Sequence, residues 1–347
     1  MEPEQYFPSS AVLWSTRWWT KETVAVVTGG NKGIGFALVK RLAELGLSVV
    51  LTARDKQKGE DAVEAIRAQL GHLAHNHVHF LLLDVSDHDS IKTFASSFKA
   101  KFGATLDILV GINFSNFNIH KQINYSNDIS PICLCDQVNN AGVSYNELDE
   151  NSVDHAESVL KTNFYGPKLL IEELLPLFRF SSSITRILNV SSRLGSLNKL
   201  RNAEVKKMLE SEELKEEEIE EMVKKFVRDV RNGTWKSEGW PSYWTDYAVS
   251  KLALNAYSKV LAKRYNNNNS NNSYKLGGSG TKLMSVNCFC PGFTQTSMTK
   301  GKGTHTADQA ASLAAILTLL PPYHLPTGKF FLLRNNTTFL HVTNSKL

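Results

Sequence analysis

A tyrosine and a lysine four positions apart are the residues of this chain whose types and spacing most directly suggest chemistry. Tyr247 and Lys251, in the segment DYAVSK, project from the same face of a predicted helix. A free phenol has a pKa near ~10, which is too high for acid–base work at neutral pH. A neighbouring ammonium group stabilises the phenolate and lowers that pKa. Because such a pair also arises by chance, it needs support from residues elsewhere in the chain.

Two polar residues could complete such a site. Ser192 closes the segment NVSS at the end of a predicted strand, where its hydroxyl could hydrogen-bond a substrate carbonyl. Asn163, in the segment KTNFYG within a predicted helix, could hold a water molecule that links Lys251 to solvent. With Tyr247 as the proton donor, these four residues form the predicted catalytic set.

A glycine-rich turn between a strand and a helix predicts a dinucleotide site. The segment TGGNKGIG follows an apolar run and opens a helical pattern. Glycines there let the backbone approach a pyrophosphate, which rests on the positive N-terminus of the helix. The turn alone is a weak signal, but its place between strand and helix makes it a strong one. The residues predicted to bind the cofactor here are Thr28, Gly29, Asn31, Lys32, Gly33, Ile34 and Gly35.

The end of the second predicted strand indicates which dinucleotide to expect. An NAD enzyme places a carboxylate there to bind the ribose 2′-hydroxyl. This chain has Arg54 instead, which together with Lys32 could hold a 2′-phosphate. Asp55 lies one residue too late for the carboxylate role, although a bent loop could bring it there. The sequence therefore favours NADP(H) over NAD(H).

Further cofactor contacts are expected where other strands end. One pair of residues follows the third strand, where the adenine ring would be bounded. A Pro-Gly turn after the last strand would cross the nicotinamide end, and a threonine beyond it could bond the carboxamide. An oxidised nicotinamide would also help Lys251 to lower the pKa of Tyr247. The residues predicted in these places are Asp84, Val85, Pro291, Gly292 and Thr296.

Strand and helix patterns alternate along the chain. Apolar, β-branched runs at 23–30, 48–54 and 78–85 are each followed by a segment with helical periodicity. Later strands are predicted at 184–192 and 282–292, and long helices at 153–178 and 246–265. This alternation predicts an α/β fold, a parallel sheet with helices on both faces.

Composition narrows the class of protein. The chain has 347 residues, 42% hydrophobic, and its charge of +5 comes from scattered basic residues, which argues against a nucleic-acid partner. No apolar run is long enough to span a membrane, and the start lacks the pattern of a secretory signal. The cysteines form two C-x-C pairs without histidine support, so we expect reduced thiols and no metal site. Trp14, Trp18 and Trp19 are expected to lay an N-terminal arm, residues 1–22, over an apolar surface.

In their order along the chain, the motifs TGxxxGxG, NNAG, Asn163, NVSS, YxxxK and the Pro-Gly turn resemble the short-chain dehydrogenase/reductase family. The resemblance extends from about Thr23 to Phe331. It implies one Rossmann-type domain with a doubly wound parallel sheet, here residues 23–347, and an oxidoreductase that acts on a small-molecule carbonyl compound. It also implies that Asn140, in NNAG, contributes to the cofactor site on the adenine side.

The chain departs from ordinary family members before Tyr247. Such members place the serine and tyrosine about a dozen positions apart, whereas Ser192 and Tyr247 are 55 positions apart. A helical insertion at 193–242 resembles that of the monomeric plant-type carbonyl reductases, in which an extra helix covers the surface used for tetramer formation. Its charged segment, predicted to be one helix over 204–230, carries an apolar stripe that must dock on another surface. The stripe consists of Ile219, Met222, Val223, Phe226 and Val230.

A second departure interrupts a predicted buried strand. Residues 110–137 stand between LDIL and VNNAG, and removing them restores the family's pattern. They correspond to a whole number of codons, and codons for Val and Gln can supply the GT and AG limits of an intron. We interpret the stretch as a retained intron translated in frame. A tolerated surface loop is the disfavoured alternative, because the break falls in a strand rather than at a loop tip. Either Leu106–Val110 or a run ending at Val138 must then fill the strand.

These patterns lead to one main hypothesis and two alternatives. The main one is NADPH-dependent reduction of a ketone to a secondary alcohol by a monomer in the cytoplasm. A dinucleotide-binding or regulatory protein, catalytically impaired by residues 110–137, is the first alternative. NAD-dependent alcohol oxidation is the second, and Arg54 and Lys32 argue against it. The C-terminal Ser345-Lys346-Leu347 would direct the chain to peroxisomes if it is read.

The substrate is less well defined by the sequence. Trp235, Trp240 and Trp244 either form apolar walls that suit a bulky cyclic ketone, such as a terpenoid or alkaloid, or pack the extra helix. A polar, low-complexity segment at 266–280 is predicted to be a surface loop.

Overall fold

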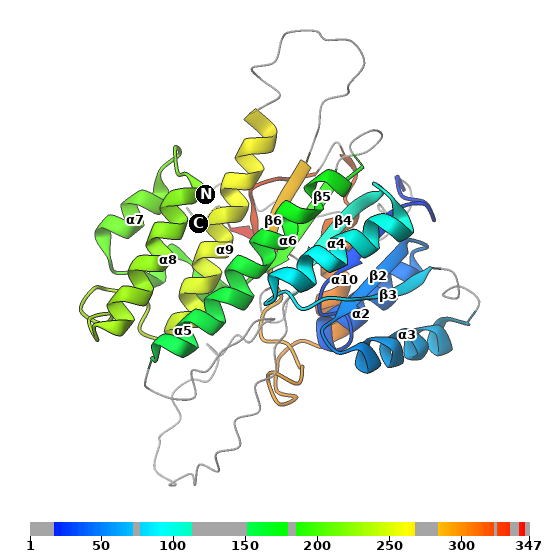
Figure 1. The fold of residues 1–347 in the computed structure, drawn as a ribbon, viewed down its shortest axis with the longest axis horizontal. Coiled ribbons are helices and arrows are strands. Elements are labelled where there is room, and N and C mark those ends of the chain that lie inside the picture. Colours follow the sequence, from blue (N-terminus) through cyan, green and yellow to red (C-terminus); the bar gives the residue numbers. More distant parts are fainter. Residues whose placement is uncertain are drawn as a thin grey trace.

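One twisted sheet with helices on both faces forms the centre of the protein (Figure 1). The computed structural model describes residues 17–71, 77–112, 151–179, 185–267, 284–322, 325–333 and 340–343. In these residues the sheet has eight strands in the order β3-β2-β1-β4-β5-β6-β7-β8. Its strands are β1 (Val24–Val27), β2 (Ser48–Ala53), β3 (Val78–Leu82), β4 (Leu106–Gly111), β5 (Thr185–Val190), β6 (Met284–Cys290), β7 (Phe330–Leu333) and β8 (Leu340–Thr343).

The sheet confirms the predicted doubly wound α/β fold. Strands β1 to β7 are parallel, and the chain order reverses between β1 and β4, where such sheets bind their ligands. The central strands β1, β4, β5 and β6 are buried along their whole length, which fits their mostly apolar and β-branched sequences. The edge strand β8 runs antiparallel to β7, which the sequence did not indicate.

Helices cover the two faces of the sheet and form separate apolar cores with it. One core includes side chains of α2, α3 and α10, and the other includes side chains of α4, α5, α6, α8 and α9. Figure 1 shows α7 and α8 on the outer side of α9, so the helical insertion adds a further layer. The helices are α2 (Gly33–Glu44), α3 (Lys56–Leu70), α4 (His88–Phe102), α5 (Val153–Leu160), α6 (Gly166–Leu174), α7 (Ala203–Glu210), α8 (Glu216–Arg231), α9 (Thr245–Asn267) and α10 (Ala307–Leu319).

Two predicted helices are interrupted. The predicted helix 153–178 is divided by one π-helical turn, Lys161–Tyr165, and ends in a short 3-10 turn. The charged segment of the insertion forms α7 and α8 rather than one helix, because Ser211 leaves the helical conformation and its side chain accepts a hydrogen bond from the backbone N–H of Glu213. The α8 stripe is buried as predicted, against α5 and α9.

The N-terminal arm packs on the sheet's α2/α10 side. Trp19 is buried and its indole N–H donates to the Leu45 carbonyl oxygen at 3.0 Å. Trp18 donates to the Leu319 carbonyl oxygen, and the Arg186 guanidinium lies 3.6 Å from the centre of its ring. The arm therefore covers an apolar surface as expected for these two residues. Trp14 lies outside the described residues.

Several other predictions fall partly or wholly outside the described residues. Asn140, Cys133, Cys135 and the C-terminal Ser-Lys-Leu belong to these, as does the predicted surface loop except for the last two residues of α9. Within the described part of the chain, Cys288 and Cys290 are free and buried, and no group of residues could hold a metal ion. No described helix is long and apolar enough to cross a membrane.

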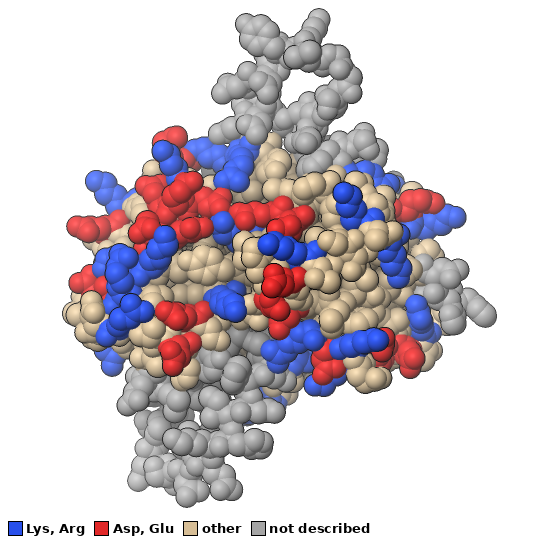
Figure 2. Space-filling view, in the orientation of Figure 1, with Lys and Arg blue, Asp and Glu red and all other residues tan. Residues whose placement is uncertain are grey.

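Charges are mixed on the surface. On the face shown in Figure 2, Lys and Arg side chains alternate with Asp and Glu, and the described part of this face carries no continuous basic patch.

Candidate active site

The predicted catalytic residues come together at the carboxyl ends of β5 and β6. Ser192 follows β5, Tyr247 and Lys251 lie one turn apart on α9, and Asn163 lies in the π-helical turn after α5. All four side chains are fully buried. The sequence pointed to four residues in three distant segments, and the fold brings them together in one cluster.

Hydrogen bonds hold each member of this cluster. The Lys251 ammonium donates to the Val190 carbonyl oxygen at 3.1 Å and lies 5.6 Å from the centre of the Tyr247 ring. The Ser192 hydroxyl oxygen accepts the backbone N–H of Leu194 at 3.1 Å, which leaves its own O–H able to donate to a carbonyl group. The arrangement suits a serine that orients a carbonyl beside a phenol.

Asn163 is connected to α9. Its amide donates to the Ser250 hydroxyl at 3.1 Å, and that hydroxyl donates to the Tyr247 carbonyl oxygen at 2.7 Å. The π-helical turn changes the direction in which the Asn163 side chain leaves its helix. A regular helix at 153–178, as the sequence predicted, would not include this turn.

Burial adjusts the proton affinity of Lys251. Loss of solvent lowers the pKa of this amine to about 7, while Cys288 and Cys290 nearby act weakly in the opposite direction. The amine can therefore gain or lose a proton in the neutral range. This property suits a residue that supports proton donation by a neighbouring phenol.

The glycine turn lies directly beside the end of β1. Gly33 has a φ of 53°, a left-handed conformation that glycine adopts without strain. A Cβ on Gly35 would lie 2.2 Å from the carbonyl oxygen of Gly29, so only glycine fits where α2 approaches the turn. Helix α2 begins at Gly33 and points its N-terminus at this turn, which fits a pyrophosphate.

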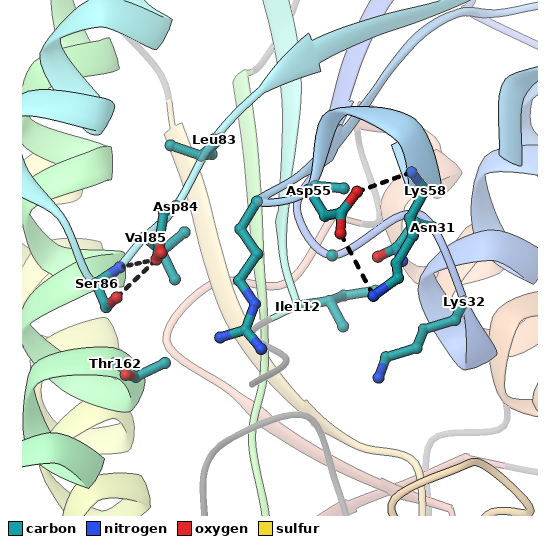
Figure 3. A pocket seen from close by; sticks show the side chains of 13 residues that line it. Asn31, Lys32, Asp55, Lys58, Leu83, Asp84, Val85, Ser86, Ile112 and Thr162 are labelled. Atoms are coloured by element: carbon teal, nitrogen blue, oxygen red, sulfur yellow. Dashed lines mark hydrogen bonds and ion pairs between the residues drawn. The ribbon is translucent and has the colours of Figure 1, made fainter. Parts of the chain in front are cut away.

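A cavity beside this turn has the composition expected for the adenosine half of a dinucleotide. Its volume is about 180 Å³. Figure 3 shows Lys32 and Lys58 on one side and Val85, Ser86 and Thr162 on the other. The lining consists of Gly29, Asn31, Lys32, Ala53, Arg54, Asp55, Lys58, Leu83, Asp84, Val85, Ser86, Ile112 and Thr162.

Three cations meet in this cavity. The pKa of Lys32 is lowered by burial and by the charges of Arg54 and Lys58. A phosphate dianion bound among them would relieve this repulsion. Sequence reasoning missed Lys58, which is recognisable as a cation four residues after Arg54, in the first turn of α3.

Two carboxylates in the cavity already have partners. Asp55 caps α3 by accepting the Lys58 backbone N–H at 3.0 Å and lies 3.4 Å from the Lys58 ammonium. This geometry disfavours the alternative in which Asp55 binds a ribose hydroxyl. Asp84 accepts hydrogen bonds from the backbone and hydroxyl of Ser86. Its neighbour Val85 lines the cavity, where the sequence placed the adenine.

The turn after β6 occupies its predicted place. Pro291 and Gly292 are buried and follow β6 directly, and Thr296 is half-buried, with its backbone N–H donating to the Thr299 hydroxyl. These residues stand on the catalytic side of the sheet, next to the end of β5. Asn140 lies outside the described residues, and Ile112 is among the described residues that line the cavity.

Only one of the three tryptophans that the sequence singled out contacts the catalytic cluster. Trp240 is buried, donates to Asp229 and packs edge-on against Phe226, and Trp235 packs on the core that α8 and α9 share with the sheet. Trp244 instead contacts the Tyr247 ring edge-on, with 5.9 Å between ring centres.

Fold and site define a dinucleotide-dependent oxidoreductase, and comparisons give its family. Residues 23–123 match the short chain dehydrogenase family. (+)-Neomenthol dehydrogenase of Arabidopsis thaliana is 35% identical over 88% of this chain and 95% of its own length. Salutaridine reductase of Papaver bracteatum is 36% identical over 90% and 94%. Carbonyl reductase [NADPH] 1 of Mus musculus is 32% identical over 88% and 95%.

Comparison with a solved structure supports the same family. The structure of salutaridine reductase from Papaver somniferum superposes with a TM-score of 0.68 and 31% identity, covering 89% of this chain and 99% of that one. The chain belongs to the short-chain dehydrogenase/reductase family and is an oxidoreductase.

Proposed function

We propose that this protein reduces the carbonyl group of a bulky cyclic ketone to a secondary alcohol with NADPH. Its cofactor is NADP(H). The relatives named carbonyl reductase [NADPH], neomenthol dehydrogenase and salutaridine reductase support this proposal. The observation that carries it is that the same fold buries Ser192, Tyr247 and Lys251 together and forms a cavity lined by three cations at the glycine turn.

The residues present fit the proposed cofactor. Lys32, Arg54 and Lys58 would hold its 2′-phosphate, and the N-terminus of α2 its pyrophosphate. When bound, NADPH supplies the hydride. We expect the Ser192 hydroxyl to orient the substrate carbonyl and the Tyr247 phenol to donate the proton to its oxygen. Lys251 would stabilise the phenolate that remains. Asn163 would hold a water molecule that links Lys251 to solvent.

An aromatic surface next to Tyr247 supports a large cyclic substrate. Trp244 has a φ of 51°, which is a strained conformation for a bulky side chain and suggests a functional constraint. Its indole stacks on the exposed Tyr243 ring at 6.0 Å and contacts Tyr247 with its edge. A terpenoid- or alkaloid-like ring would gain apolar contact there while its carbonyl reaches the phenol.

We also propose a cytoplasmic monomer. The α8 stripe packs on α5 and α9, which supports the absence of a further subunit on that face. The buried free thiols Cys288 and Cys290 suit a reducing compartment. Light scattering that gave a stable tetramer would contradict the monomer, and a fluorescent fusion confined to an organelle would contradict the location.

Tyr247→Phe tests the chemistry. The variant removes the proton donor and keeps the ring, so we expect NADPH binding and melting temperature to stay close to those of the natural chain. Turnover on a panel of cyclic ketones should fall about 10²–10⁴-fold. A variant that binds NADPH and retains most of the turnover would refute the role of Tyr247. A natural chain that reduces none of the ketones would refute the proposed function.

A further inference from the structure

Of the three described residues of the stretch 110–137, one lines the cofactor cavity. Ile112 is fully buried and lines the cavity. Its backbone N–H donates to the Thr28 hydroxyl oxygen at 2.6 Å, and that hydroxyl donates to the Ile112 carbonyl oxygen at 2.6 Å. Thr28 therefore fixes the position of Ile112 from the end of β1.

The sheet fixes the same position through the preceding residues. Val110 pairs with Val27 of β1 and Leu188 of β5, and the Thr28 backbone N–H donates to its carbonyl oxygen at 3.0 Å. Gly111 pairs with Asn189, where a Cβ would lie 2.9 Å from the Asn189 side-chain oxygen. The first three residues of the stretch are thus part of the fold.

Counting along the chain shows what they replace. In a chain without the stretch, Leu109 would be followed by Val138, Asn139 and Asn140. Ile112 is the third residue after Leu109, as Asn140 would be. An aliphatic side chain therefore stands where the family's NNAG motif would place an asparagine.

We propose that Ile112 is a cofactor-binding residue whose side chain forms an apolar wall for the adenosine half of NADP(H). This inference rests on the proposed function. Besides its cations, the cavity has an aliphatic part made of Leu83, Val85 and Ile112. Figure 3 shows Ile112 between the two lysines and Val85 in this view. An adenosine 2′-phosphate carries a dianion and a flat ring with apolar faces, which match the two kinds of lining.

Substituting the side chain tests this role without removing the backbone bonds to Thr28. Ile112→Ala is compared with Ile108→Ala, since Ile108 lies in β4 four residues before Ile112, belongs to the same core, is equally buried and does not line the cavity. Both variants lose the same atoms, so both should melt at a lower temperature. Dissociation constants for NADPH and for adenosine 2′,5′-bisphosphate are measured by titration on the full-length chain.

We expect Ile112→Ala to weaken binding of both ligands about five- to tenfold, through lost apolar contact, and Ile108→Ala to change it less than about twofold. If either alanine variant fails to fold, Ile112→Val and Ile108→Val are compared, with about a twofold loss expected for the first alone. Tight binding by the natural chain with equal weakening in both variants, or in neither, would overturn this inference alone. A natural chain that does not bind NADPH would overturn the proposed function as well.

Discussion

The helical insertion and the stretch that begins at Val110 enter the same sheet in different ways. The insertion lies between β5 and α9 and has its own buried apolar stripe and its own helix caps. The stretch begins within β4. Its first two residues, Val110 and Gly111, complete that strand, and its third, Ile112, is hydrogen-bonded to Thr28. The insertion adds a layer to the fold, whereas the stretch substitutes for residues of the existing fold.

This difference shows what each place in the fold requires. Strand pairing depends on backbone groups and on residues that suit a buried strand, so Val110-Gly111 can complete β4. The insertion had to supply apolar surface of its own, because a helix with only charged faces would not stay on α9. Of the two ways in which the sequence allowed this strand to be filled, the structure shows the first: Leu106–Val110 forms it, and β4 extends over Leu106–Gly111.

The largest effect should come from the stripe of the insertion. Phe226 is fully buried and contacts Trp240 edge-on. Phe226→Ala should lower the free energy of unfolding by about 3–5 kcal/mol, measured by denaturant titration. Lys224→Ala, an exposed residue on the same helix, should change it by less than about 0.5 kcal/mol. Similar small effects for both would show that α8 is only loosely attached.

An ion cluster also attaches α8 to the rest of the protein, and we expect it to contribute less to stability than the apolar stripe. The largely buried Lys168 ammonium on α6 lies 2.7 Å from Glu216 and 3.2 Å from Glu220 of α8, and 2.9 Å from Glu172. Lys168→Met should lower the free energy of unfolding by about 1.5–3 kcal/mol, because it leaves these carboxylates without their shared cation. Equal stability of variant and natural chain at neutral pH would contradict this role.

The same cluster predicts a dependence on pH. Burial raises the pKa of Glu216, but hydrogen bonds from Lys168 and Arg264 outweigh it and bring the pKa below its usual value. Glu216 therefore binds a proton more readily in the unfolded chain, and its contribution is lost as the pH falls through the folded-state pKa. The difference in stability between Lys168→Met and the natural chain should shrink on acidification below about pH 4. A difference that stays constant would exclude Glu216 as the partner.

The sequence predicted those parts of the fold that depend on regular patterns. Periodicity located the parallel strands and the helices around them, and motif order selected Ser192, Tyr247 and Lys251, which the fold places close together. It could not show the π-helical turn at Asn163 or the break at Ser211, because tertiary contacts decide between helical forms at single residues.

Other features depend on neighbours in space. Lys58 joins Arg54 and Lys32 only once α3 folds back on the glycine turn. Likewise, the pattern of residues 110–112 did not reveal that Thr28 would hold Ile112, because that bond joins two distant segments.

The smallest effect concerns the cation that the sequence missed. Lys58→Ala should weaken NADPH binding about three- to tenfold and leave NADH binding nearly unchanged, since only NADPH carries the 2′-phosphate. Lys56→Ala serves as control, because Lys56 lies on the same turn of α3 and does not line the cavity. Equal loss for both cofactors would place Lys58 away from the phosphate.

The most direct test of this account compares the thermal melting of the full-length chain and of a variant without Val110–Gln137, each with and without NADPH. If the stretch is a retained intron, the shorter chain should melt higher, by an amount equivalent to about 1 kcal/mol from the shorter connection between β4 and α5. Because Ile112 completes the cavity, NADPH should raise the melting temperature of both chains, with affinities within about tenfold of each other. A rise with NADPH in the shorter chain alone would contradict the claim that the full-length protein holds its cofactor in a site completed by the stretch.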